Sequence, residues 1–198
     1  MDQMNATGWT GITLRPLNDN YGRKKMEKEI LVKLTRQEIH KCYMLGNDTV
    51  KLCEMQKASP RLENDKQSRR EANVYGFMAE FAVAKLLGLE KTDLTVASDF
   101  GIDLWWNDTS IDVKFTNRDD GDLIFDSMSA FKADIAVLVT KTNDKSLMKV
   151  CGWMSADDFA EKSEDHNYGH GDRLRVLQPQ LEDIKDLWKK MKSEEWSR

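Results

Sequence analysis

Residues 101–115 read GIDLWWNDTSIDVKF and predict two short strands joined by a tight turn at Asn107-Asp108. Asn and Asp tolerate the left-handed backbone that such turns need. If the turn has two residues, Asp103 lies opposite Asp112, with Cβ atoms about 5 Å apart on one face of the hairpin. Lys114 shares that face because side chains alternate along a strand. The opposite face is apolar and carries Ile102, Leu104, Trp106, Ile111, Val113 and Phe115.

The polar face of this hairpin has the chemistry of a metal site. Two carboxylates held this close repel each other, and a divalent cation removes the repulsion. Aspartate oxygens suit a hard cation such as Mg²⁺, which keeps several waters and accepts a substrate phosphate. Lys114 can then orient or activate an attacking water, or stabilise charge on a phosphate. The alternative interpretation is a solvated hairpin face on which Lys114 offsets the charge of Asp112.

A second acid sits in the helix that we expect upstream, over residues 67–87, with Gly88 as its C-cap. From Val74 onward this helix is apolar almost all round, so it should be buried. Glu80 lies in its middle, and a buried carboxylate must be neutralised, paired or bound to metal. A salt bridge from Glu80 to an Arg or Lys elsewhere is the structural alternative.

These motifs together resemble the PD-(D/E)XK nuclease superfamily, which has the restriction-endonuclease-like fold. They are Gly-x-x-x-Glu on the helix, Gly-Ile-Asp on one strand and Ile-Asp-Val-Lys on the next, within residues 70–155. The proline that often precedes the first aspartate in the family is replaced by Ile102. The resemblance implies an α/β fold in which helices flank a mixed central sheet, with an αβββαβ core.

The resemblance also implies roles for individual residues. By position, Asp103 and Asp112 would hold Mg²⁺, or Mn²⁺ in its place, with the Val113 backbone carbonyl as a further ligand. Glu80 would bind a second metal or a metal-bound water, and Lys114 would position the water that attacks phosphorus. The implied substrate is DNA.

The composition is that of a globular protein that can bury a core. The chain has 198 residues, of which 40% are hydrophobic and 32% charged. We expect an N-terminal arm and helical extension over residues 1–66 and a nuclease-like core with a C-terminal helix over 67–198. Neither a membrane span nor a signal peptide is predicted, and three scattered cysteines fit a reducing cytoplasm.

The net charge of −4 argues against an unselective nucleic-acid coat protein but not against a nuclease, which needs only a local basic patch. Candidate DNA contacts are Arg69 and Arg70, at the entry to the Glu80 helix, and Arg118 and Lys132, near the hairpin. A solvated surface is the alternative for each of them.

Further elements follow from periodicity and capping. A capping box at residues 35–38 predicts a helix over 36–57, broken near Gly46. Residues 30–34 read as a strand or a helix end. We expect strands at 11–14, 92–97, 123–125, 133–140 and 147–153, a helix capped by Ser155, a loop over 164–172, an edge strand at 173–177 and a final helix from Pro179. His166 and His170 have the spacing of zinc ligands on a helix, but the loop composition argues against a zinc site.

Three functions are therefore carried forward. The first is a metal-dependent nuclease that hydrolyses DNA phosphodiester bonds, with a homodimer as a possible state because cutting both strands usually takes two sites. The second is a DNA- or protein-binding module that keeps the nuclease fold but has lost catalysis. The third is a metal-dependent phosphohydrolase that acts on a small nucleotide.

Overall fold

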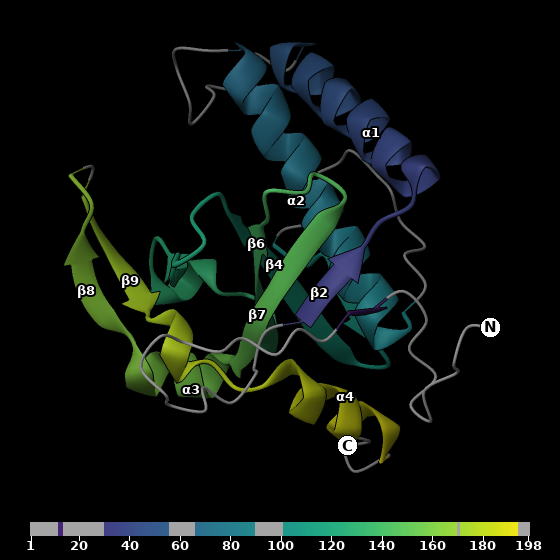
Figure 1. Cartoon of the computed structure of the whole chain (residues 1–198). Helices are drawn as coiled ribbons and strands as arrows, with labels where there is room; N and C mark the ends of the chain where they lie inside the picture. Colours follow the sequence, from purple (N-terminus) through teal and green to yellow (C-terminus); the bar gives the residue numbers. More distant parts are fainter. Residues whose placement is uncertain (1–11, 14–29, 56–65, 90–100, 170, 194–198) are drawn as a thin grey trace, which may run out of the picture.

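The computed structural model describes residues 12–13, 30–55, 66–89, 101–169 and 171–193, which form a mixed α/β fold (Figure 1). A six-stranded sheet with the order β1-β2-β7-β6-β4-β3 lies at its centre, and a three-stranded sheet has the order β5-β9-β8. Strands β4 and β6 are parallel, and every other pairing in the two sheets is antiparallel. The expected mixed central sheet flanked by helices is therefore present.

The bounds of the elements are as follows. The large sheet contains β1 (Ile12–Thr13), β2 (Ile30–Lys33), β3 (Leu104–Trp106), β4 (Thr109–Thr116), β6 (Ile135–Lys141) and β7 (Leu147–Ser155). The small sheet contains β5 (Leu123–Phe125), β8 (Glu164–Asn167) and β9 (Asp172–Val176). The helices are α1 (Arg36–Met55), α2 (Lys66–Leu87), α3 (Ala156–Lys162) and α4 (Ile184–Lys192), and single 3₁₀ turns occur at Met128–Ala130 and Gln178–Gln180.

The two faces of the large sheet are covered by different elements. On one face, α2 and α4 pack against strand residues that include Ile111 and Val113. On the other face, the small sheet and α3 form a second core around Phe125, Phe131 and Phe159, whose rings contact one another. Helix α1 packs along α2, away from the small sheet (Figure 1). The alternation of side chains along β4 therefore decides which residues face each core.

The predicted hairpin is confirmed, with the expected register between residues 104–106 and 109–111, and the expected pairing of Asp103 with Asp112 lies outside this paired stretch. Trp106 pairs with Thr109 and Leu104 with Ile111, so the turn contains only Asn107 and Asp108. Asn107 has a φ of 49°, the left-handed conformation that such a turn requires. One detail of the expected apolar face is wrong. Ile102 packs against the second core, because regular pairing begins only at Leu104 and the alternation does not extend back to this residue.

Several further expectations are confirmed. Thr35 and Glu38 form the capping box of α1, and the side chain of Ser155 accepts a hydrogen bond from the Asp158 N–H at the start of α3. Gly88 follows α2 with a φ of 71°. Strands occur at residues 12–13, 30–33, 123–125, 135–141 and 147–155, while the expected strand at 92–97 lies outside the described residues.

Other expectations are wrong because tertiary packing overrides the local signal. Helix α1 runs unbroken through Gly46, which lies against Val74 of α2. The expected loop over 164–172 contains β8, and the expected edge strand is β9, the central strand of the small sheet. Pro179 lies in a 3₁₀ turn, so the last helix starts later, at Ile184.

The connection between the parallel strands β4 and β6 differs from the αβββαβ pattern. It is fully described and contains β5 and a 3₁₀ turn in place of an α-helix. Within the described residues, no helix is long and apolar enough to cross a membrane.

Candidate metal and nucleic-acid site

The β3–β4 hairpin brings Asp112 and Lys114 together, as the sequence predicts. Asp112 lies on β4 between β3 and β6, and only 1% of its side chain is exposed. The Lys114 ammonium lies 2.6 Å from each oxygen of this carboxylate. Because a buried carboxylate is costly without compensation, this ammonium balances its charge. The Lys114 ammonium also lies 4.9 Å from the centre of the Phe125 ring, which places the pair on the face of the second core.

Asp103 is fixed to the same strand through the backbone. Its Oδ2 accepts a hydrogen bond of 2.6 Å from the Val113 N–H, and its own N–H donates to the Ile111 carbonyl at 2.9 Å. The first contact places the Asp103 carboxylate beside the backbone that directly follows Asp112. The hairpin therefore gathers two carboxylates and one ammonium along three residues of β4.

A second polar contact holds the start of β4 against the start of β6. Asp134 Oδ2 accepts hydrogen bonds of 2.8 Å from both the N–H and the hydroxyl of Ser110. In return, the Asp134 N–H donates to the Ser110 carbonyl at 3.1 Å. These bonds fix the parallel pair from which the Asp112 side chain projects, and the sequence analysis did not single them out.

Glu80 comes from a different layer of the fold. It is half-buried on α2, whose neighbouring residues Ala79 and Ala82 belong to the first core. That core lies against the face of the sheet opposite to the Asp112–Lys114 pair. Across the described ranges, no three His, Cys, Asp or Glu side chains form a group that could hold a metal ion. The role assigned to Glu80 thus stays a prediction.

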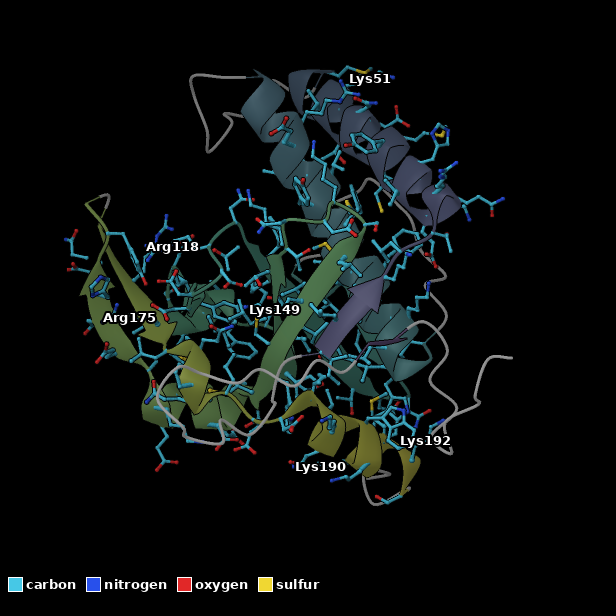
Figure 2. The ribbon with its side chains drawn as sticks, in the orientation of Figure 1. Lys51, Arg118, Lys149, Arg175, Lys190 and Lys192 are labelled. Atoms are coloured by element: carbon cyan, nitrogen blue, oxygen red, sulfur yellow. The ribbon has the colours of Figure 1, made fainter. Side chains whose placement is uncertain are left out.

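The candidate DNA contacts are spread over the molecule. Arg70 and Lys132 are exposed, and the side chain of Arg69 lies outside the described part of the chain. Arg118 is exposed and pairs with Asp120 at 3.3 Å, and this hydrogen bond raises the pKa of Arg118 and lowers that of Asp120. Figure 2 shows Arg118 beside the small sheet and Lys149 in the centre of the fold.

Sequence reasoning missed Lys149, a buried cation on β7. Lys149 is 8% exposed and contacts both the carboxylate and the carbonyl of Asp119, in the loop that follows β4. Lys149 pairs with Thr140, which pairs with Thr116 across β6 and β4. This loop is therefore attached to the sheet near the Asp112–Lys114 pair. The signal in the sequence was a single lysine inside the apolar strand 147–153.

His166 lies in strand β8, where its ring packs edge-on against Tyr168, and His170 lies outside the described residues.

Comparisons of the chain with protein-family models, with curated proteins and with solved structures found no match. The functional argument therefore depends on the residues of the chain and their geometry.

Proposed function

We propose that this chain is a Mg²⁺-dependent nuclease that hydrolyses DNA phosphodiester bonds, with a core of the restriction-endonuclease-like type. The observation that supports it most is the hairpin geometry, in which Asp103 accepts a hydrogen bond from the Val113 N–H and the Lys114 ammonium contacts Asp112. The order of α2, the β3–β4 hairpin and the parallel pair β4–β6 gives further support. The helix missing from the connection between β4 and β6 is the main departure from the αβββαβ pattern.

The donor atoms of this site fit a hard divalent cation. Asp103 and Asp112 supply carboxylate oxygens, and Val113 supplies a backbone carbonyl, as Mg²⁺ prefers. A positive charge already lies against Asp112 in the form of the Lys114 ammonium. Asp103, Asp112 and the Val113 carbonyl would hold Mg²⁺, or Mn²⁺ in its place, whereas Glu80 belongs to the layer on the opposite face of the sheet. When bound, the metal neutralises phosphate charge and makes a bound water more acidic.

Lys114 has the geometry to donate a hydrogen bond to a water or to a phosphate oxygen. Its side chain is 36% exposed, so its ammonium reaches solvent while it touches the buried Asp112. A water or a non-bridging phosphate oxygen can accept a hydrogen bond from the same ammonium. Asp112 restrains the ammonium at this position, and the centre of the Phe125 ring lies 4.9 Å from it. Lys114 can therefore orient the attacking water in line with the leaving oxygen.

The test is a plasmid-nicking assay with Mg²⁺ or Mn²⁺ on the Asp112→Asn and Lys114→Met variants. We expect each variant to lose at least 100-fold of the cleavage rate, because each removes a charge at the reacting phosphate. Asp157→Asn and Lys145→Met, exposed positions far along the chain, are the matched controls and should cleave as the wild type does. Thermal unfolding of each variant separates lost chemistry from lost folding. Unchanged cleavage in folded Asp112→Asn and Lys114→Met would refute the proposal.

One observation favours the alternative of a binding module without catalysis. The Lys114 ammonium contacts both oxygens of Asp112, so the cation requirement of that carboxylate is met by the chain itself. Titration calorimetry with MgCl₂ separates the two functions. A nuclease should take up Mg²⁺ at millimolar concentrations and lose this uptake in Asp103→Asn, whereas a binding module should show no heat beyond dilution.

A further inference from the structure

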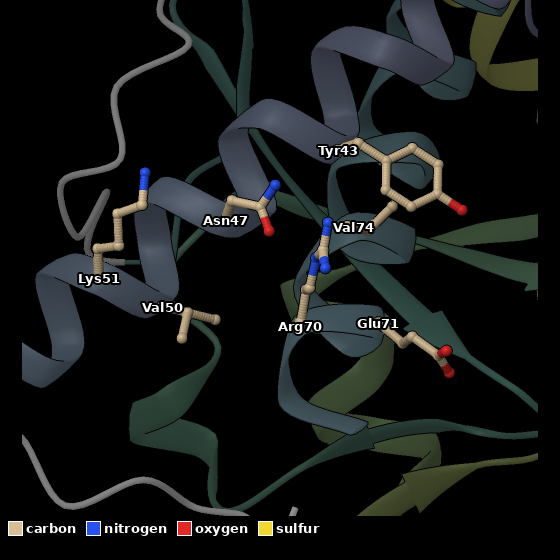
Figure 3. Close-up of a pocket in the computed structure, with 7 residues that line it drawn as sticks. All are labelled: Tyr43, Asn47, Val50, Lys51, Arg70, Glu71 and Val74. Atoms are coloured by element: carbon tan, nitrogen blue, oxygen red, sulfur yellow. The ribbon is translucent and has the colours of Figure 1, made fainter. Parts of the chain in front are cut away.

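A partly open pocket lies between the two long helices, outside the proposed catalytic site. It has a volume of about 680 Å³ and is lined by Tyr43, Asn47, Val50, Lys51, Arg70, Glu71 and Val74 (Figure 3). This volume lies within the range of small-molecule sites, about 300–1,000 Å³. Its residues come from α1 and from the first half of α2, on the part of the helical pair that extends away from the small sheet (Figure 1).

The pocket follows from the way in which the helices approach each other. A Cβ atom on Gly46 would lie 2.6 Å from Val74 Cγ2, so the helices are in tight contact at this glycine. Tyr43, Asn47 and Val50 are spaced by four and three residues and therefore share one side of α1 beside this contact.

The polar groups in this pocket are available to a ligand. Within the described ranges, Arg70, Asn47 and Tyr43 make no side-chain hydrogen bond or ion pair, and Arg70 is exposed. Figure 3 shows the Arg70 guanidinium pointing toward Asn47, while the carboxylate of Glu71 points away from it. Lys51 also points away and pairs with Asp48 at 3.0 Å. Arg70 is therefore the charged group that projects into the pocket.

These residues combine an aromatic surface with a planar cation. The Tyr43 side chain is 42% exposed although it borders a cavity, so one part of it stays open for stacking. Tyrosine rings stack on nucleic-acid bases with little regard to sequence, and arginine binds phosphate through paired N–H groups. The Asn47 amide adds a donor and an acceptor for a base edge or a sugar.

We propose that this pocket binds an unpaired nucleotide of the DNA substrate, with its base on Tyr43 and its phosphate on Arg70. The inference rests on the proposed function in that it takes DNA as the ligand, and it adds that the substrate carries a single-stranded segment. A paired base hides both of its faces in the helical stack, so only an unpaired base can enter a pocket.

The test measures DNA binding in EDTA, where cleavage does not occur. Fluorescence anisotropy compares a labelled single-stranded oligonucleotide with a blunt duplex of the same length. We expect Tyr43→Ala to raise the Kd for the single strand about 5- to 150-fold, the range of a lost base stack. Arg70→Gln should raise it about tenfold and lower the slope of log K against log salt by about 0.7, the value of one phosphate contact.

Matched controls and a catalytic variant make the outcomes distinct. Met44→Ala and Lys41→Gln change exposed residues of α1 outside the pocket and should bind as the wild type does. Equal binding of the single strand by wild type, Tyr43→Ala and Arg70→Gln, or no binding by the wild type, would overturn the inference even if DNA is cleaved. If the pocket variants weaken binding but wild type never cleaves DNA with Mg²⁺, the inference stands and the nuclease proposal fails. Asp112→Asn should lose cleavage while it keeps single-strand binding.

Discussion

The pair formed by Asp112 and Lys114 gives a prediction that joins stability to function. The substitution Lys114→Met keeps an apolar stem over Phe125 and removes the ammonium 2.6 Å from both Asp112 oxygens. Asp112 is 1% exposed, and removal of one partner of a fully buried pair costs about 3–5 kcal/mol. Because 36% of the Lys114 side chain is exposed, water already weakens the pair, so we expect a loss of about 2–3 kcal/mol. In a chain of this length, such a loss lowers Tm by about 5–10 °C.

Urea unfolding at pH 7 measures this loss, and Lys189→Met is the matched control. Lys189 pairs with Asp186 at 2.9 Å, but the two side chains are 70% and 51% exposed, so we expect no measurable change. MgCl₂ should then stabilise Lys114→Met more than the wild type, because the cation can replace the missing ammonium. With a Kd of about 1 mM, 10 mM MgCl₂ adds about 1.4 kcal/mol. If Lys114→Met is as stable as the wild type, the ammonium does not balance the Asp112 charge. If it is destabilised but Mg²⁺ gives no rescue at matched ionic strength, the metal site is refuted.

Two further predictions concern the helical pair. Gly46→Ala should lower the free energy of unfolding by about 1–3 kcal/mol, because its Cβ would lie 2.6 Å from Val74 Cγ2. Gly76→Ala should raise it by about 0.5–1 kcal/mol, because a Cβ at this helical position meets no atom within 4 Å. Thermal and urea unfolding measure both changes. Burial raises the pKa of Glu38, but hydrogen bonds from the Thr35 backbone and from Lys85 outweigh it and lower the pKa below the ordinary 4.5. The stabilisation is then fully present above about pH 4.5 and is lost as the pH falls through the lower folded-state pKa. The urea midpoints of wild type and Glu38→Gln should therefore differ at pH 7 and converge below that folded-state pKa.

The hairpin was predictable because its determinants are local. The dipeptide Asn107-Asp108 fixes a two-residue turn, and the turn fixes which residues on the two strands face each other. The contact of Asp112 with Lys114 then follows from strand alternation, because the two residues lie two apart on β4. The bond from the Val113 N–H to Asp103 forms before the first paired residue of β3 and does not follow from alternation. The same reasoning is wrong for Ile102, because this residue precedes the first paired residue of β3 and side chains alternate regularly only within a strand.

The features that sequence reasoning missed depend on partners far along the chain. Glycine at position 46 indicates a helix break only when the helix is considered alone, and in the fold it permits the contact with Val74. Residues 164–167 have the composition of a loop and become a strand because they pair with β9. Lys149 is buried because Asp119, thirty residues earlier, returns over β7 to meet its ammonium. None of these contacts leaves a periodic signal.

The parts of the candidate site also differ in whether local sequence or distant packing determines their positions. Asp103 and Asp112 are nine residues apart, so the position of one carboxylate relative to the other depends on a single turn and tolerates changes in the surrounding layers. Glu80 belongs to a helix that packs on the opposite face of the sheet, so its position relative to the aspartates depends on how α2 seats against Ile111 and Val113. A substitution that shifts this packing should change any contribution from Glu80 while it leaves the hairpin contacts intact. The hairpin is therefore the part of the site that the chain specifies most directly, and Glu80 is the part that the whole fold must place.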